Sequence, residues 1–138
     1  MPTWAKVLLA IFAIIAALLI AGGFIGYHWV MKNKGQLMVS RKEGAAFGRD
    51  KDAAQCIDTA LSRIDGTLTK TIAARTFVAG CLTTASGTSE LCATIPPPDE
   101  FMKRARWAID RCRERGSVDQ QGCAQVFQEV EQSCARRR

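Results

Sequence analysis

The chain contains an uninterrupted apolar stretch from Val7 to Val30, VLLAIFAIIAALLIAGGFIGYHWV, with no Lys, Arg, Asp or Glu. Its twenty-four residues would form about 36 Å of α-helix, enough to cross a hydrocarbon core of about 30 Å with some tilt. Trp4 precedes the stretch and Trp29 lies at its end, the positions that aromatic rings favour at a membrane–water interface. The stretch predicts a membrane-spanning helix.

The length of this stretch favours an uncleaved anchor over a removable signal peptide. A signal peptide has an apolar region of about 7–15 residues followed by small residues at the cleavage site. Here the run is longer, and bulky residues from Tyr27 to Lys32 stand at its end where small residues would be needed. We therefore expect a signal anchor at 1–31, a basic juxtamembrane linker at 32–48 that frays near Gly35, and a cysteine-bearing domain at 49–138.

Within the apolar stretch, Gly22 and Gly26 form a G-x-x-x-G pattern. Small residues four positions apart let two membrane helices approach closely, so the pair predicts a self-association surface of the span. Glycine and alanine are frequent in any membrane helix, and small residues that simply face lipid are the alternative.

The remaining residues show apolar positions at helical spacing and no strand-like alternation. Four helices are predicted, at about 53–64, 68–84, 98–116 and 117–134, with a loop over 85–98. The third carries Phe101, Ala105, Ala108 and Cys112 at spacings of 4, 3 and 4, supported by Met102 and Ile109. The predicted fold class is all-α: one N-terminal transmembrane helix followed by a small disulfide-stapled antiparallel bundle of about four helices.

Polar residues mark the predicted helix starts. Thr67, after Asp65 and Gly66, is a candidate N-cap for the second helix. Asp99 and Glu100 follow Pro98 and would lie in the first turn of the third helix. A capping box S-x-x-Q, formed by Ser117 and Gln120, predicts the start of the fourth.

Six cysteines lie in the predicted helical domain and none lies in the span. An even number of cysteines in a small domain indicates a disulfide framework. Symmetry about the two hairpin turns predicts the pairs Cys56–Cys81 and Cys112–Cys123, which leaves Cys92 with Cys134. Buried free thiols are the main alternative. The spacings lack the C-x₂₋₄-C pairs of zinc sites and the C-x-x-C of thiol–disulfide enzymes, so no metal or cofactor is expected.

Two signals disagree about which side of the membrane the domain occupies. Lys6 precedes the span, whereas Lys32, Lys34, Arg41 and Lys42 follow it, and the positive-inside rule then places the domain in the cytoplasm. The cysteines argue for an oxidising compartment outside the cytoplasm. We give the cysteines more weight and expect an exported domain on a single-pass protein of the inner or cytoplasmic membrane.

The third predicted helix is rich in cations and is the candidate partner face. Its proposed contact residues are Lys103, Arg104, Arg106, Trp107, Arg111 and Arg115. A solvated charged face is the alternative for the cations, and Trp107 is either a core residue or an exposed contact. From Gly44 onward, fourteen basic residues stand against twelve acidic ones, so nucleic acid is not the expected partner.

No phosphate-binding loop, dinucleotide fingerprint or nucleophile beside a base occurs in the sequence. We therefore expect a non-enzymatic interaction or structural module of the cell envelope. Its expected partners are the membrane, a protein of unknown identity and a second copy through the span. Two alternatives stay open: a cytoplasmic domain that binds nucleic acid or anionic lipid, and a redox protein that uses Cys112 and Cys123.

Overall fold

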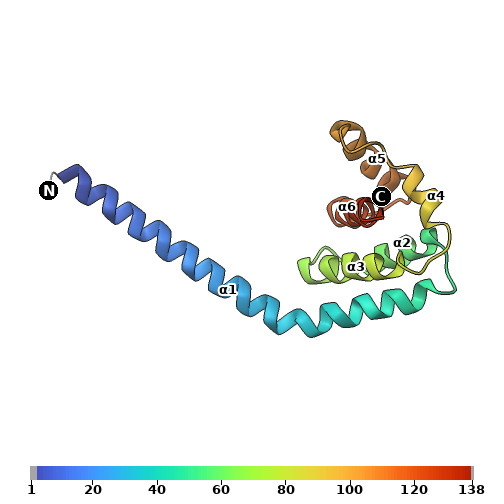
Figure 1. The fold of residues 1–138 in the computed structure, drawn as a ribbon, viewed down its shortest axis with the longest axis horizontal. Coiled ribbons are helices and arrows are strands. Elements are labelled where there is room, and N and C mark those ends of the chain that lie inside the picture. Colours follow the sequence, from blue (N-terminus) through green and yellow to red (C-terminus); the bar gives the residue numbers. More distant parts are fainter. Residues whose placement is uncertain (1–2, 138) are drawn as a thin grey trace. The chain divides into compact units, whose positions relative to one another are not determined.

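A computed structural model describes residues 3–137, and helices make up most of this range, with no β-strand within it. The helices are α1 (Thr3–Gly48), α2 (Ala53–Leu61), α3 (Leu68–Cys81), α4 (Thr88–Ala93), α5 (Phe101–Glu114) and α6 (Gln120–Ala135) (Figure 1). The all-α class predicted from the sequence is confirmed.

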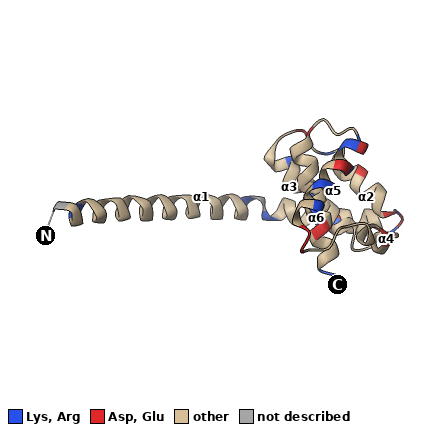
Figure 2. Ribbon diagram, turned by 90° about the horizontal axis from the view of Figure 1, so that it is seen from above, with Lys and Arg blue, Asp and Glu red and all other residues tan. Residues whose placement is uncertain are grey.

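The chain divides into two compact units, the first ending at Gly35 and the second beginning at Gln36. In the first unit, Trp4–Lys32 of α1 is long and apolar enough to cross a membrane, and its side chains are not buried by the rest of the protein. The middle of α1 is free of charged residues (Figure 2). A signal sequence near an N-terminus can also be a helix that is long and apolar enough to meet this description.

The second unit is built from two helical hairpins, and α6 of one hairpin packs against the other hairpin. Helices α2 and α3 form one hairpin, α5 and α6 form the other, and α6 contacts α2, α3, α4 and α5. The apolar faces of these helices are buried against one another, which is the main stabilising term for a bundle of this size. Its largest fully buried side chains, apart from cysteine, are Phe77, Phe127, Ile57, Leu82, Val78, Val126 and Val130.

Three disulfides cross-link this core. Cys56–Cys81 joins α2 to α3, Cys92–Cys134 joins α4 to α6, and Cys112–Cys123 joins α5 to α6. The Cα–Cα distances are 5.8, 5.4 and 5.9 Å, within the usual range for a disulfide. Hairpin symmetry predicts the pairs Cys56–Cys81 and Cys112–Cys123 from the sequence, and Cys92–Cys134 is the pair that then remains.

The end of α1 belongs to the second unit and packs against α3. Gly44 and Gly48 are buried, and a Cβ on Gly44 would overlap the carbonyl oxygen of Phe77. Arg63 and Glu43 form an ion pair of 2.8 Å nearby. The segment 32–48, predicted as a basic juxtamembrane linker that frays near Gly35, is helical through Gly48, and its last turns pack on the bundle.

One of the predicted N-caps is found in the structure and another is not. Thr67 caps α3 by accepting a hydrogen bond from the backbone N–H of Lys70, as predicted. Asp119, and not Ser117, caps α6, because its carboxylate accepts from the backbone N–H of Gly122 at 2.8 Å. The predicted Ser117 capping box is wrong. The predicted loop over 85–98 contains α4, and α5 begins at Phe101.

The apolar stripe predicted on α5 is only partly buried. Ala108 and Cys112 lie in the core, but Phe101 and Met102 are 75% and 76% exposed, and Ala105 is also exposed. The reason is that α5 packs mainly against α6, which leaves much of its circumference without cover.

Candidate functional site

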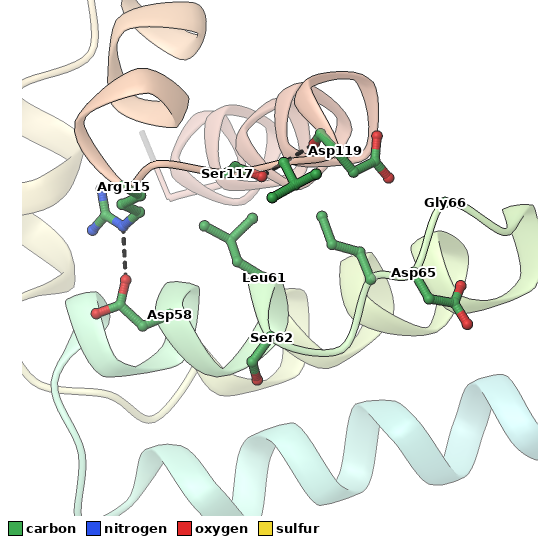
Figure 3. A pocket seen from close by; sticks show the side chains of 10 residues that line it. Asp58, Leu61, Ser62, Asp65, Gly66, Arg115, Ser117 and Asp119 are labelled. Atoms are coloured by element: carbon green, nitrogen blue, oxygen red, sulfur yellow. Dashed lines mark hydrogen bonds and ion pairs between the residues drawn. The ribbon is translucent and has the colours of Figure 1, made fainter.

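A concave surface of the second unit lies between its two hairpin turns. It is an open groove of about 1040 Å³, and we call it the two-turn groove. One wall is formed by the end of α2 and the turn that follows it; the other is formed by the turn between α5 and α6 (Figure 3). Its lining consists of Asp58, Leu61, Ser62, Ile64, Asp65, Gly66, Arg115, Ser117, Val118 and Asp119.

An ion pair connects the two walls of the groove. The Nε atom of Arg115 lies 2.7 Å from the carboxylate of Asp58, across the groove in Figure 3. The Arg115 guanidinium also lies 5.5 Å from the ring centroid of Phe127, within cation–π range. Arg115 is thus held in place by α2 and by the core, and it is the one cation in the lining.

Two further carboxylates stand on the rim. The carboxylate of Asp65 accepts hydrogen bonds from the hydroxyl and the backbone N–H of Thr67, at 2.6 and 3.0 Å. These bonds stabilise the carboxylate and lower the pKa of Asp65 below its ordinary value. Asp119 is the N-cap of α6. With Asp58 balanced by Arg115, the lining has a net charge of −2.

The floor of the groove is apolar. Leu61 and Ile64 are partly buried and pack against the core, whereas Val118 is fully exposed. Leu61 points into the space between the two walls (Figure 3). An apolar floor beneath acidic side chains suits an apolar segment that carries positive charge.

The residues predicted to form a partner face on α5 do not lie together on one exposed surface. Most of its cations have intramolecular partners: Lys103 pairs with Glu100 at 2.9 Å, Arg104 with Glu131 at 2.9 Å, and Arg111 with Glu114 at 3.0 Å. Arg115 lies in the two-turn groove. Arg106 is exposed and has no acidic partner within residues 3–137.

Trp107 packs mainly on the core. Its ring meets the ring of Phe127 edge to face, with centroids 5.4 Å apart. Its indole nitrogen and the Nε atom of Arg104 are buried without a hydrogen-bond partner in the described part of the chain. Burial also raises the pKa of Glu131, although Arg104 opposes this effect.

The exposed surface of α5 combines apolar and basic side chains. Met102, Ile109, Arg113 and Arg106 fall within about 60° of the helix circumference, at about 100° per residue. Phe101 and Ala105 continue this surface toward α6 and line a smaller groove of about 480 Å³. We call these six residues the outer face of α5.

The other predicted sites are placed as follows. Cys112 and Cys123 are fully buried and bonded to each other, so the pair offers no exposed sulfur to a thiol. Gly22 and Gly26 are exposed in α1, and a Cβ on either would meet nothing within 4 Å. Within residues 3–137 no group of three or more His, Cys, Asp or Glu side chains could hold a metal ion.

The two-turn groove was not predicted from the sequence. Its residues come from two turns that are far apart in the sequence, and the capping motifs in these turns do not indicate that the turns lie side by side. The weak signal was Val118, an apolar residue in a short polar turn. In the comparisons with known proteins, no protein-family model, no curated protein and no solved structure matches the chain.

Proposed function

We propose that this protein is a single-pass, membrane-anchored interaction module whose disulfide-bonded helical domain lies outside the cytoplasm. The observation that carries the proposal is the combination of a charge-free apolar helix with a small bundle in which all six cysteines are paired. Disulfides persist in oxidising compartments, and small exported domains commonly depend on them.

The proposed role is binding and not catalysis. The two-turn groove has an apolar floor, and its charged groups are already engaged in a helix cap, a turn or an ion pair. Carboxylates in these roles support the fold, and the groove offers a partner both apolar contact and negative charge. The membrane type proposed is the inner or cytoplasmic membrane of a cell with an oxidising envelope.

The anchor is tested by extracting membranes with alkaline carbonate and measuring the intact mass of the protein that remains. If the anchor is uncleaved, we expect full-length protein in the membrane fraction that remains after extraction, because a helix of about 24 apolar residues is not removed from lipid by alkaline carbonate. A soluble product that lacks the apolar stretch would show a removed signal peptide and would overturn the anchored function.

A further inference from the structure

The bundle leaves two apolar surfaces uncovered, and they differ in charge and shape. The outer face of α5 lies along one exposed helix, whereas the two-turn groove is a larger hollow between two turns. The first presents exposed Phe101, Met102 and Ile109, and the second presents Val118 above Leu61 and Ile64. Exposed apolar surfaces of this kind commonly mark a site of protein association.

The charges of the two surfaces are complementary. Arg106 and Arg113 flank Met102 and Ile109 on α5; Arg106 has no acidic partner within residues 3–137, and Arg113 lies 4.0 Å from Asp110. The groove carries a net charge of −2, from Asp65 and Asp119. A basic apolar helix and an acidic apolar groove fulfil the requirements of helix-in-groove recognition.

We propose that the two-turn groove of one molecule binds the outer face of α5 from a second copy of the same chain. A molecule cannot fill its own groove, because Arg115, directly after the last residue of α5, already forms part of the groove wall. The groove volume of about 1040 Å³ lies at the upper end of typical binding pockets, enough for several side chains of a docked helix.

This contact joins two different surfaces and is therefore heterologous. A heterologous contact builds rings or open rows, since in each pair one copy keeps a free α5 and the other keeps a free groove. Confinement to a membrane, which rests on the proposed function, would raise the effective concentration of the copies. The contact itself does not depend on which side of the membrane the domain faces.

The test uses the full chain reconstituted in phosphatidylcholine vesicles, with the photoreactive residue p-benzoylphenylalanine in place of Phe101. We expect cross-links from this position to residues 61–66 or 115–119 of another copy, identified by mass spectrometry. Cross-links to lipid alone, cross-links to α5 of the other copy, or no intermolecular cross-link would each overturn the proposal.

Two variants separate the two halves of the contact. Val118→Lys alters the groove and Met102→Glu alters α5, and both positions are exposed, so the fold should be retained. Each is expected to lower intermolecular cross-linking at least about tenfold. Val39→Lys and Met38→Glu are the matched controls, because they make the same changes at exposed positions elsewhere in the second unit and should leave cross-linking unchanged.

Mixing the two variants tests whether the contact joins the groove of one copy to α5 of another. A photoreactive copy carrying Val118→Lys still has an intact α5, and a probe-free copy carrying Met102→Glu still has an intact groove. Their mixture should regain cross-linked dimers and no larger species. Failure to regain dimers, with both variants shown to be folded by circular dichroism, would overturn the head-to-tail contact while leaving the anchored function intact.

Discussion

At the scale of single residues, glycine decides how closely α1 approaches α3. Gly44 and Gly80 lie on the two sides of this contact, and a Cβ on either would overlap a carbonyl oxygen of the other helix, that of Phe77 or of Arg41. The hydroxyl of Thr84 adds a hydrogen bond of 2.7 Å to the carbonyl oxygen of Ala45. The end of α1 is thus attached by backbone contact as well as by side chains.

Gly44→Ala should therefore destabilise the second unit. We expect the free energy of unfolding to fall by about 1–3 kcal/mol, because the added methyl group forces the two helices apart. The measurement is urea unfolding of the full chain in detergent, followed by circular dichroism. Gly35→Ala is the matched control, since its Cβ would meet nothing within 4 Å and alanine favours the helix. An equal loss of unfolding free energy in both variants would contradict a close contact between α1 and α3 at Gly44.

The half-buried carboxylate of Glu131 should make stability depend on pH. Burial raises its pKa above the ordinary value of 4.5, so the folded state holds this proton more tightly than the unfolded state. The resulting stabilisation is fully present below pH 4.5 and is lost as the pH rises through the folded pKa.

In the variant Glu131→Gln the side chain cannot ionise, so its contribution to the pH dependence of stability should be lost. The unfolding free energy of the wild type minus that of the variant should therefore decrease as the pH rises from below 4.5. Chemical unfolding across a pH series measures it, with Glu90→Gln, at an exposed position, as the control for the change in charge. A difference that grows with pH would instead mean that the ion pair with Arg104 outweighs the cost of burial.

At the scale of helices, α6 holds the bundle together and two of the three disulfides end on it. Cys134 connects it to α4 and Cys123 connects it to α5. The bridges differ in the length of chain that they close: 42 residues for Cys92–Cys134 and 11 for Cys112–Cys123. A longer closed loop restricts the unfolded chain more strongly.

Removing the long bridge should accordingly cost more than removing the short one. Replacing Cys92 and Cys134 by Ala should lower the free energy of unfolding by about 4 kcal/mol, against about 3 kcal/mol for Cys112 and Cys123. The measurement is the urea midpoint of the full chain without reductant. The reverse order would show that packing around the buried Cys112–Cys123 pair dominates over chain entropy.

Periodicity and turn residues predicted the hairpins, because apolar positions repeat every three to four residues and Gly66 and Gly116 separate the helices. Both glycines have positive φ values in the structure, 83° and 61°. The short helix α4 was missed, since a helix of six residues leaves too brief a pattern. The apolar residues of the outer face, Phe101, Met102, Ala105 and Ile109, were assigned to the apolar stripe of the helix, because periodicity shows that a helix has an apolar side without showing how much of that side is covered.

At the scale of the molecule, the sequence indicates the apolar helix and the stapled bundle, whereas the groove depends on distant parts of the chain. The groove arises because the turns after α2 and after α5 lie side by side, an arrangement held by the Arg115–Asp58 ion pair and by packing around α6. No local pattern encodes that proximity. The attachment of α1 to α3 was missed for the same reason, since isolated glycines in a basic segment resemble a linker.

The central claim is that the disulfide-bonded domain lies outside the cytoplasm, and thiol labelling of intact cells tests it most directly. Cells that express the full chain are treated with a membrane-impermeant maleimide, before and after a membrane-impermeant reductant, and the labelled positions are mapped by mass spectrometry. We predict no label on the six cysteines before reduction, and label from outside the cell after it on the Cys92–Cys134 pair, because Cys92 is only partly buried. Free thiols that react only after lysis would contradict the account, because they would place the domain in the reducing cytoplasm.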